Sequence, residues 1–265
     1  MAFYTGLLVL LFAFCVNAQK TDEKAQAVLA KAIQNLGGDR YLQIKSQVGR
    51  GTFYLIHEGG VVFLKQIGGE ASSQKFVDVL VFPDKERTDF KSAGTRTIQA
   101  NSGDTGWIYD SDLEVVKVQT PVQIANFRES IRTTIDYLLR GSWKGDADLT
   151  YAGRRPGTLG KRNDVVRLTF KDGFTVEFEF ADDGLPQKAI HKHLNAAGEE
   201  LKEEDRYAQF IDIDGIKTPF VVDRFTNGSH ASRINYESVE FNKTIPESIF
   251  AKPATPKDAK KDLKL

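Results

Sequence analysis

The sequence predicts a mainly β protein of the α+β class, in which a strongly curved antiparallel sheet forms an open half-barrel. Roughly a dozen short segments rich in Val, Ile, Phe and Thr alternate with glycine pairs and Asp-Gly turns, which is typical of hairpins. The gaps between these segments are too short for parallel crossovers. Only two segments show helical periodicity. Two or three helices must therefore cover the concave face of the sheet as a lid.

The first residues predict an export signal. The segment 1–6 is short and has no charged side chain. The apolar run 7–16 that follows is too short to span a bilayer as a helix. Val16-Asn17-Ala18 supplies modest side chains where signal peptidase cuts, so we expect a signal peptide over 1–18 and cleavage after Ala18. The mature chain is then expected in the periplasm of a bacterial cell envelope.

Cys15 is the single cysteine of the chain, and it lies inside the predicted signal. A lipoprotein is the less favoured alternative, because bulky Phe14 precedes Cys15 where a lipidation site needs a small residue. The mature chain has no cysteine for a disulfide or a thiolate nucleophile. Its 36 basic and 36 acidic residues leave no net charge to attract nucleic acid, so we expect no nucleic-acid partner.

The first mature element is expected to be a helix capped by Asp22 and ended by Gly37-Gly38. Its apolar residues recur at helical spacing: Val28, Leu29, Ala32, Ile33 and Leu36. Strands are then expected over 48–57 and 61–67, joined by Glu58-Gly59-Gly60, and over 75–82, 86–91, 95–101, 105–110 and 113–118.

A second helix is predicted from Pro121 to about Leu139, with Gly141 as its stop. Strands follow over 148–153, 164–170, 173–180, 186–194, 200–212, 216–226 and 231–240. Lys171-Asp172-Gly173 and Asp182-Asp183-Gly184 are expected to form tight hairpin loops. Residues 19–250 are thus expected to form a single domain, and the polar segment 251–265 a disordered tail.

Residues 174–180 show the clearest alternation, with Phe174, Val176, Phe178 and Phe180 on one face. One side of this sheet is therefore expected to be dry. A packed core and an apolar cavity both fit the pattern, and the packed core is favoured.

Three regions carry motifs of a known family. Pro83-Asp84-Lys85-Glu86-Arg87 is followed by Phe90 and then by the segment 101–110, which contains Asp104-Thr105-Gly106-Trp107-Ile108-Tyr109. Asp183-Gly184-Leu185-Pro186 follows the phenylalanine strand, and Ile245-Pro246-Glu247-Ser248-Ile249-Phe250 closes the pattern. These motifs resemble the periplasmic LolA/LolB-like lipoprotein carriers, the outer-membrane lipoprotein-sorting proteins. In that family an arginine precedes the first of these prolines, where Phe82 stands here.

The resemblance implies a non-catalytic, monomeric carrier of lipids or lipoprotein acyl chains, which meets the membrane only transiently. The residues expected to line its cavity or lid are Phe53, Leu55, Phe63, Trp107, Tyr109, Phe127, Ile131, Ile135, Phe174, Val176, Phe178 and Phe180. The alternative is an exported structural or interaction domain with a packed core, no ligand and an envelope protein as its partner.

Enzyme chemistry is not expected. The chain has no Gly-x-Ser-x-Gly elbow, and its Asp182-Asp183 and Glu199-Glu200 pairs fall in polar runs. His191 and His193 share a strand face and could bind a metal with His57 or His230, but a solvent-exposed strand explains them better. We therefore expect no catalytic residue, metal or cofactor.

Overall fold

The computed structural model describes residues 22–57, 60–61, 73–195, 197–261 and 263. The strands are β1 (Ser46–His57), β2 (Gly60–Val61), β3 (Ser73–Val81), β4 (Lys85–Ser92), β5 (Thr95–Ser102), β6 (Thr105–Asp110), β7 (Val115–Val118), β8 (Ala147–Pro156), β9 (Arg162–Phe170), β10 (Thr175–Phe180), β11 (Pro186–Leu194), β12 (Glu200–Ile213), β13 (Ile216–Thr226) and β14 (Ser229–Phe241). The helices are α1 (Glu23–Leu36), α2 (Asp39–Leu42), α3 (Pro121–Arg132), α4 (Ile135–Leu139) and α5 (Pro256–Ala259), with 3-10 turns η1 (Thr158–Gly160) and η2 (Glu247–Ile249).

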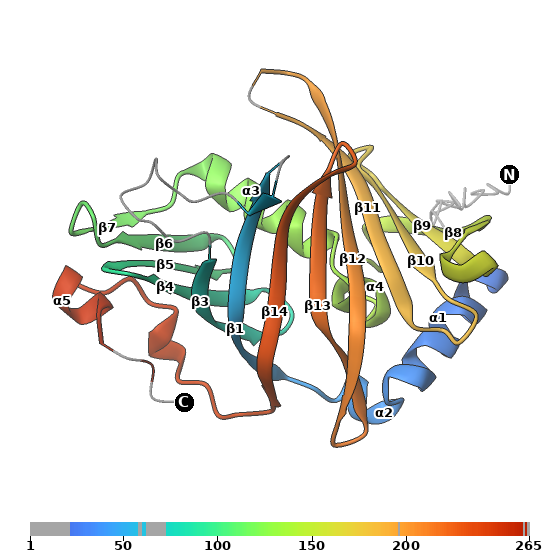
Figure 1. The fold of residues 1–265 in the computed structure, drawn as a ribbon, viewed down its shortest axis with the longest axis horizontal. Helices are drawn as coiled ribbons and strands as arrows, with labels where there is room; N and C mark the ends of the chain where they lie inside the picture. Colours follow the sequence, from blue (N-terminus) through green and yellow to red (C-terminus); the bar gives the residue numbers. More distant parts are fainter. Residues whose placement is uncertain (1–21, 58–59, 62–72, 196, 262, 264–265) are drawn as a thin grey trace, which may run out of the picture.

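The strands form one antiparallel sheet in the order β7-β6-β5-β4-β3-β1-β14-β13-β12-β11-β10-β9-β8, and β2 pairs with β1 off this path. The sheet is not closed, because β7 and β8 are its two edges. Figure 1 shows α1, α3 and α4 behind the sheet, on its concave face, and α5 in front of it. The predicted half-barrel with covering helices is confirmed.

Helix α1 begins where the sequence predicts and is tied to the sheet by its own cap. The Asp22 carboxylate accepts the backbone N–H of Lys24 at 2.8 Å and that of Tyr151 in β8 at 3.1 Å. The bond from Tyr151 contributes most to lowering the pKa of this carboxyl. At the other end Gly37 has φ 135°, and a Cβ there would lie 2.6 Å from the carbonyl oxygen of Gly215. Glycine therefore lets α1 end against the β12–β13 turn.

The predicted helix over 121–139 is wrong as a single element, because it is broken between α3 and α4. The Thr133 and Thr134 hydroxyls donate to the carbonyls of Ser130 and Ile131 at 2.7 and 2.9 Å. Thr134 also caps α4 by accepting the N–H of Tyr137 at 3.1 Å. Side-chain bonds of this kind compete with the helical ladder, so two short helices replace one long helix.

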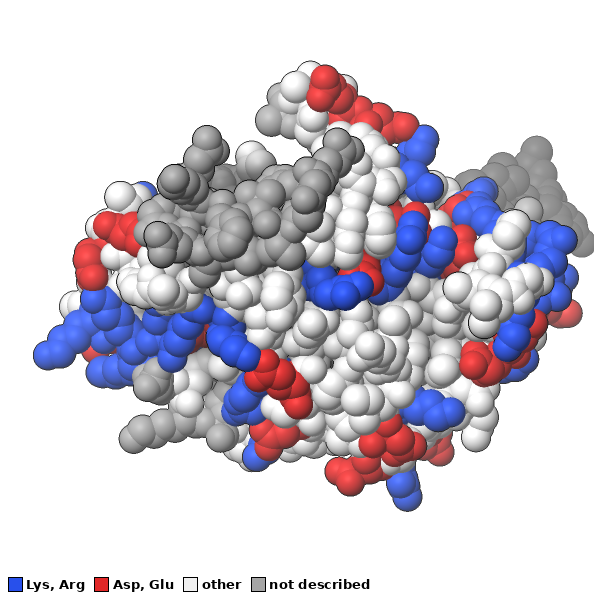
Figure 2. All heavy atoms as spheres, in the orientation of Figure 1, with Lys and Arg blue, Asp and Glu red and all other residues white. Residues whose placement is uncertain are grey.

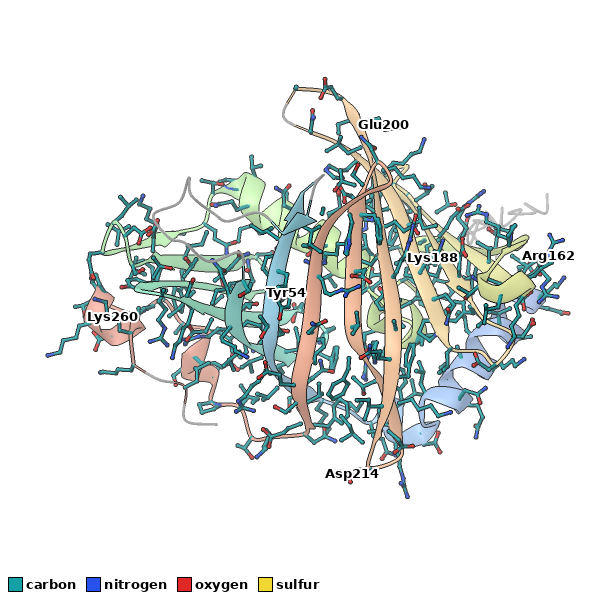
Figure 3. All side chains as sticks on the ribbon, viewed as in Figure 1. Tyr54, Arg162, Lys188, Glu200, Asp214 and Lys260 are labelled. Carbon is teal, nitrogen blue, oxygen red and sulfur yellow. The ribbon has the colours of Figure 1, made fainter. Side chains whose placement is uncertain are left out.

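The C-terminal segment is partly ordered, so the prediction of a disordered tail over 251–265 is wrong for its described residues. Thr255 caps α5, and Ala259 is buried against Ile98, Trp107 and Tyr109 on the convex face. Lys260, labelled in Figure 3, lies 2.6 Å from Glu114. Few apolar residues suffice here because the segment only has to fill a hollow that the sheet already forms.

The face shown in Figure 2 has separate charged and uncharged areas. A band of charged side chains crosses the upper part of β12–β14, an area without charged side chains lies below it, and lysine and arginine side chains gather toward α5 and β4. The β11–β12 hairpin extends beyond the sheet near Glu200, and Asp214 marks the β12–β13 turn at the opposite end (Figures 1 and 3).

The other predicted strands lie within a few residues of the observed ones, and both predicted hairpin loops are present, after Phe170 and after Phe180. Most of the strand predicted over 61–67 lies outside the described residues, as does the signal peptide over 1–18. None of the helices within the described ranges is long and apolar enough to cross a membrane.

The packing of α5 is testable with one buried alanine. Ala259→Glu would place a carboxylate among apolar side chains, or else detach the segment, and should lower the free energy of unfolding by roughly 1–3 kcal/mol. Ala254→Glu is the matched control, because Ala254 is exposed. Urea unfolding of both variants measures the difference, and equal stability of the two would contradict the described docking of α5.

Candidate ligand-binding groove beneath helix α3

The concave face has two halves of different character. The half formed by β8–β11 is filled: α1, α4 and these strands share one core of buried side chains, which includes Leu29, Leu36, Leu138, Trp143, Leu149, Val166, Leu168, Val176, Phe178 and Phe180. Helix α4 is locked into it by Trp143, whose indole N–H donates to the Leu138 carbonyl at 2.9 Å. This half resembles an ordinary, close-packed protein interior.

The other half, formed by β3–β6, is hollow beneath α3. A cavity of about 370 Å³ lies between the helix and the sheet, within the usual range for ligand sites of roughly 300–1,000 Å³. It is lined by Glu86, Thr88, Phe90, Gln99, Asn101, Ile108, Gln123, Asn126, Phe127 and Ser130. We call this space the groove.

A smaller recess of about 80 Å³ adjoins the groove on the side of α4. The two spaces share Glu86 and Phe127. The recess is mostly apolar and is lined by Leu80, Val81, Phe82, Pro83, Asp84, Lys85, Glu86, Phe127, Ile131, Thr134, Asp136, Tyr137, Arg140 and Ser142. A polar space is thus joined to an apolar one.

Helix α3 covers the groove with little buried surface of its own. Of its twelve residues, all of which the structure describes, only Phe127 is buried. Val122 is 68% exposed. Since buried apolar area supplies most of the energy that holds a helix in place, α3 is held weakly along its length.

The start of α3 is anchored by a pair of amides. Asn101 Nδ2 donates to Gln119 Oε1 at 2.7 Å, and Gln119 Nε2 donates back to Asn101 Oδ1 at 3.0 Å. Both side chains are buried. A Cβ on Gly106 would lie 2.6 Å from either amide, so the glycine of the Thr105-Gly106-Trp107 motif makes room for this pair.

The end of α3 is anchored by an arginine. Arg132 makes two bonds to the Asp172 carboxylate, of 2.8 and 2.9 Å, and lies 3.7 Å from the ring centroid of Phe170. These bonds hold the pKa of Asp172 down at about 2. Because the pair is partly exposed, it contributes only about 0–1 kcal/mol.

A second arginine lies against Phe82, the position at which the lipoprotein carriers have an arginine. Arg140, which follows α4, lies 4.0 Å from the ring centroid of Phe82 and 2.9 Å from Asp136. It also donates to the carbonyls of Tyr41 and Ile44 at 3.1 and 2.9 Å. The Arg140 guanidinium therefore packs on the Phe82 ring. Arg140 follows α4, which is part of the filled core, and does not belong to α3.

Two carboxyl groups lie in or beside the floor of the groove. Asp78 of β3 faces Thr88 of β4 in register, and the Thr88 hydroxyl lies 2.8 Å from Asp78 and 3.3 Å from Glu86. Burial raises the pKa of Asp78 to about 8, and the nearby charge of Glu86 adds to the shift. Burial also raises the pKa of Glu86. The floor can thus donate as well as accept hydrogen bonds at neutral pH.

Arg224 brings positive charge to the same face. Its Nε lies 3.5 Å from Asp205 of β12, and its side chain is 49% exposed. Burial lowers the pKa of Arg224, but the combined attraction of Asp205, Tyr236, Glu86 and Tyr207 outweighs this effect, so the pKa is raised. The attraction of Arg224 also opposes the rise in the pKa of Asp78. A half-exposed guanidinium on the concave face is available to an anionic or polar group.

Among the residues predicted to contact a ligand, Phe127 lines both spaces and Ile131 lines the recess. Phe53 contacts the groove residue Phe90, with ring centroids 5.8 Å apart, and Leu55 is half-buried on the same strand. Val176, Phe178 and Phe180 belong to the filled core, against which Ile135 and Phe174 pack. Phe63 lies outside the described residues.

Trp107 and Tyr109 lie on the convex face, away from the groove. Trp107 donates its indole N–H to the Phe250 carbonyl at 2.8 Å, and both side chains are buried beneath the C-terminal segment. Ile108, between them, faces the groove instead. The strand was predicted correctly, but its alternation does not show which face lines the groove.

The polar lining was not predicted. Glu86 and Thr88 on β4, and Gln99 and Asn101 on β5, are spaced two apart and share a face. This alternation is visible in the sequence. The alternation indicates that the concave face of β4 and β5 is polar, in contrast to the apolar concave face at residues 174–180.

The raised pKa of Asp78 predicts a pH dependence of stability. An unfolded aspartate titrates near 4, so between about pH 4 and 8 the folded protein binds the extra proton, and stability falls as pH rises through this window. Asp78→Asn, which imitates the neutral acid, should reduce the loss between pH 5 and 9 by on the order of 2 kcal/mol.

Urea unfolding at both pH values measures this difference. Asp112→Asn is the control, because Asp112 is exposed in the β6–β7 turn. An Asp78→Asn variant that loses as much stability with rising pH as the parent protein would contradict the assignment.

Comparison with known proteins gives a fold and no sequence relative. No protein-family model matches the chain, and no curated protein matches it. A DUF1329 family protein from Desulfovibrio piger superimposes with a TM-score of 0.59 at 14% identity, over 86% of this chain and 97% of the other. A LolA superfamily protein from Nitrosomonas europaea superimposes with a TM-score of 0.52 at 16% identity, over the same shares of the two chains. The chain therefore has a LolA-like fold, as its motifs predict.

Proposed function

We propose that this protein is a non-catalytic periplasmic carrier that holds a lipid, or the acyl chain of a lipoprotein, beneath α3. The observation that carries the proposal is the groove itself: a polar space joined to an apolar recess, under a helix with one buried side chain. The LolA-like fold supports it. Export through the predicted signal at residues 1–18 would bring the mature chain to the envelope.

The two spaces suit the two ends of an amphipathic ligand. The recess beside Phe82, Ile131 and Tyr137 offers apolar side chains to an acyl chain. The floor at Glu86, Thr88 and Asn101 offers hydrogen bonds to a glycerol, ester or headgroup. A purely apolar ligand would displace water from the carboxyl group of Glu86 without replacing its hydrogen bonds, which is costly.

The energies allow α3 to act as a lid. Lifting it exposes Phe127, which costs about 1.5–3 kcal/mol, and breaks exposed ion pairs worth roughly 0–1 kcal/mol each. Each methylene moved out of water contributes about 0.8 kcal/mol. Burying about four methylenes therefore offsets the loss, and a longer chain favours the open, loaded form.

Native mass spectrometry of protein purified from its own envelope without detergent tests the proposal. A bound diacyl or triacyl species, identified after lipid extraction, would support a carrier and name its cargo. A bare mass that stays bare after incubation with phospholipid would favour the alternative, an interaction domain that binds another envelope protein.

Filling the groove should abolish uptake without disturbing the core. Gln99 is exposed on the groove floor, so Gln99→Trp should reduce binding of a diacyl phospholipid by at least about tenfold through lost volume, while the filled half of the concave face stays intact. Thr169→Trp on β9 is the matched control, also an exposed strand position. Titration of delipidated protein with a fluorescent phospholipid measures both variants, and equal uptake would place the ligand elsewhere.

A further inference from the structure

We propose that Glu129, His191 and His193 form a metal site, suited to Zn²⁺, that fastens α3 to β11. Glu129 lies in the last turn of α3, and the two histidines lie on β11. One ligand atom from each of the three lies within 4.8 Å of the other two. The inference goes beyond the carrier proposal, since metal binding does not depend on any lipid.

The donor set and spacing fit zinc after a small adjustment. Two imidazoles and one carboxylate, with water as the fourth ligand, are a recognised tetrahedral zinc set, and bonds of about 2.0–2.1 Å place ligand atoms about 3.4 Å apart. Because the ligand atoms lie within 4.8 Å of one another, the three side chains need to close by at most about 1.4 Å. All three are half-buried, so the ion can enter from solvent and water can complete the coordination.

The two histidines are already oriented toward one space. They are two residues apart on one strand, so they share the concave face, and their rings stack with centroids 6.0 Å apart. The Phe174 ring meets His191 edge-on at 5.9 Å. Such contacts limit the rotation of His191 and reduce the entropy that binding would cost.

The surrounding charges also favour a cation. Glu203 of β12 lies directly opposite His191 in register, where its carboxylate accepts the Thr226 hydroxyl at 2.9 Å. The two arginines of α3 that flank Glu129 in the sequence are both paired with carboxylates, Arg132 with Asp172 and Arg128 with Asp104. An ion at the site would therefore meet net negative charge.

From the sequence we expect no metal here, and we consider only His57 or His230 as a third ligand beside His191 and His193. His230 is unsuitable, because it lies 2.8 Å from Asp223 and stacks on Phe225, on the other face of the sheet. The His57 side chain lies outside the part of the protein that the structure describes. Glu129 is 62 residues away from His191, so only the fold brings it to the pair.

A metal bound here would join the lid to the fixed part of the molecule. Helix α3 has one buried residue of its own, whereas β11 belongs to the filled half of the sheet. A bond between them would hold α3 closed over the groove, because lifting the helix would remove one of three ligands.

Isothermal titration of the mature protein with Zn²⁺ tests the site. We expect one Zn²⁺ per chain, and affinity at least about tenfold weaker in Glu129→Gln and in His193→Asn. The matched controls are Glu114→Gln and His230→Asn, which remove the same groups elsewhere and should bind as the parent does. No zinc binding by the parent, or equal affinity in all four variants, would overturn the proposal.

Hydrogen exchange separates a fastened lid from simple adsorption. Zn²⁺ should slow exchange of the α3 amides in the parent protein and leave the Glu129→Gln variant unchanged, although that variant keeps both histidines. Zinc that binds through His191 and His193 alone, with the same α3 exchange in both proteins, would show that the lid takes no part.

Discussion

The apolar contact between α1 and strands β8–β11 is the interaction on which the rest of the molecule depends. An antiparallel sheet this wide curves, and its concave face must be covered. Leu29 and Leu36 of α1 provide that cover by packing with the strand residues Val176 and Phe178. Because Asp22 bonds both to its own helix and to β8, the helix cannot slide along the sheet. One half of the barrel thereby becomes rigid.

That rigidity lets the other half remain hollow. A protein of this size does not need every part of its sheet to be packed, because burial rises with chain length. The polar residues Thr88, Gln99 and Asn101 could not be buried in a dry interface without partners. The groove keeps Thr88 and Gln99 accessible, whereas Asn101 is buried with its partner Gln119. The packed core and the open groove thus lie on different strands of one sheet.

Much of the fold could be predicted from local patterns, because hairpin turns and strand alternation are local properties. Residues 174–180 show this well, since their predicted dry face is the core of the filled half. The predictions that failed depend on contacts that local sequence patterns do not show. Alternation predicted the strand that contains Trp107 and Tyr109. It did not predict on which face of the sheet these side chains are buried, because the C-terminal segment that covers them is more than 140 residues away. The helix break arose from hydroxyl bonds of Thr133 and Thr134, which a periodicity of apolar residues does not register.

The candidate site was harder to predict than the fold for the same reason. Phe127 and Ile131 were found because an amphipathic helix has to direct its apolar stripe inward. The acid pair of Asp78 and Glu86 is a property of strand register, since Asp78 of β3 lies next to Thr88 and Glu86 of β4 only once the two strands have paired.

A lid has to be held firmly enough to exclude water and weakly enough to open. In α3 the firm contacts are at its ends, the amide pair of Gln119 and the ion pair of Arg132, and its middle depends on Phe127. This distribution favours movement of the helix about its ends over its complete release. In the proposed carrier, a ligand would replace the contacts of Phe127 as the middle of α3 moves away from the sheet. The middle of α3 is therefore where the amino-acid sequence of the helix, with Phe127 as its one buried residue, sets how tightly the helix packs over the groove.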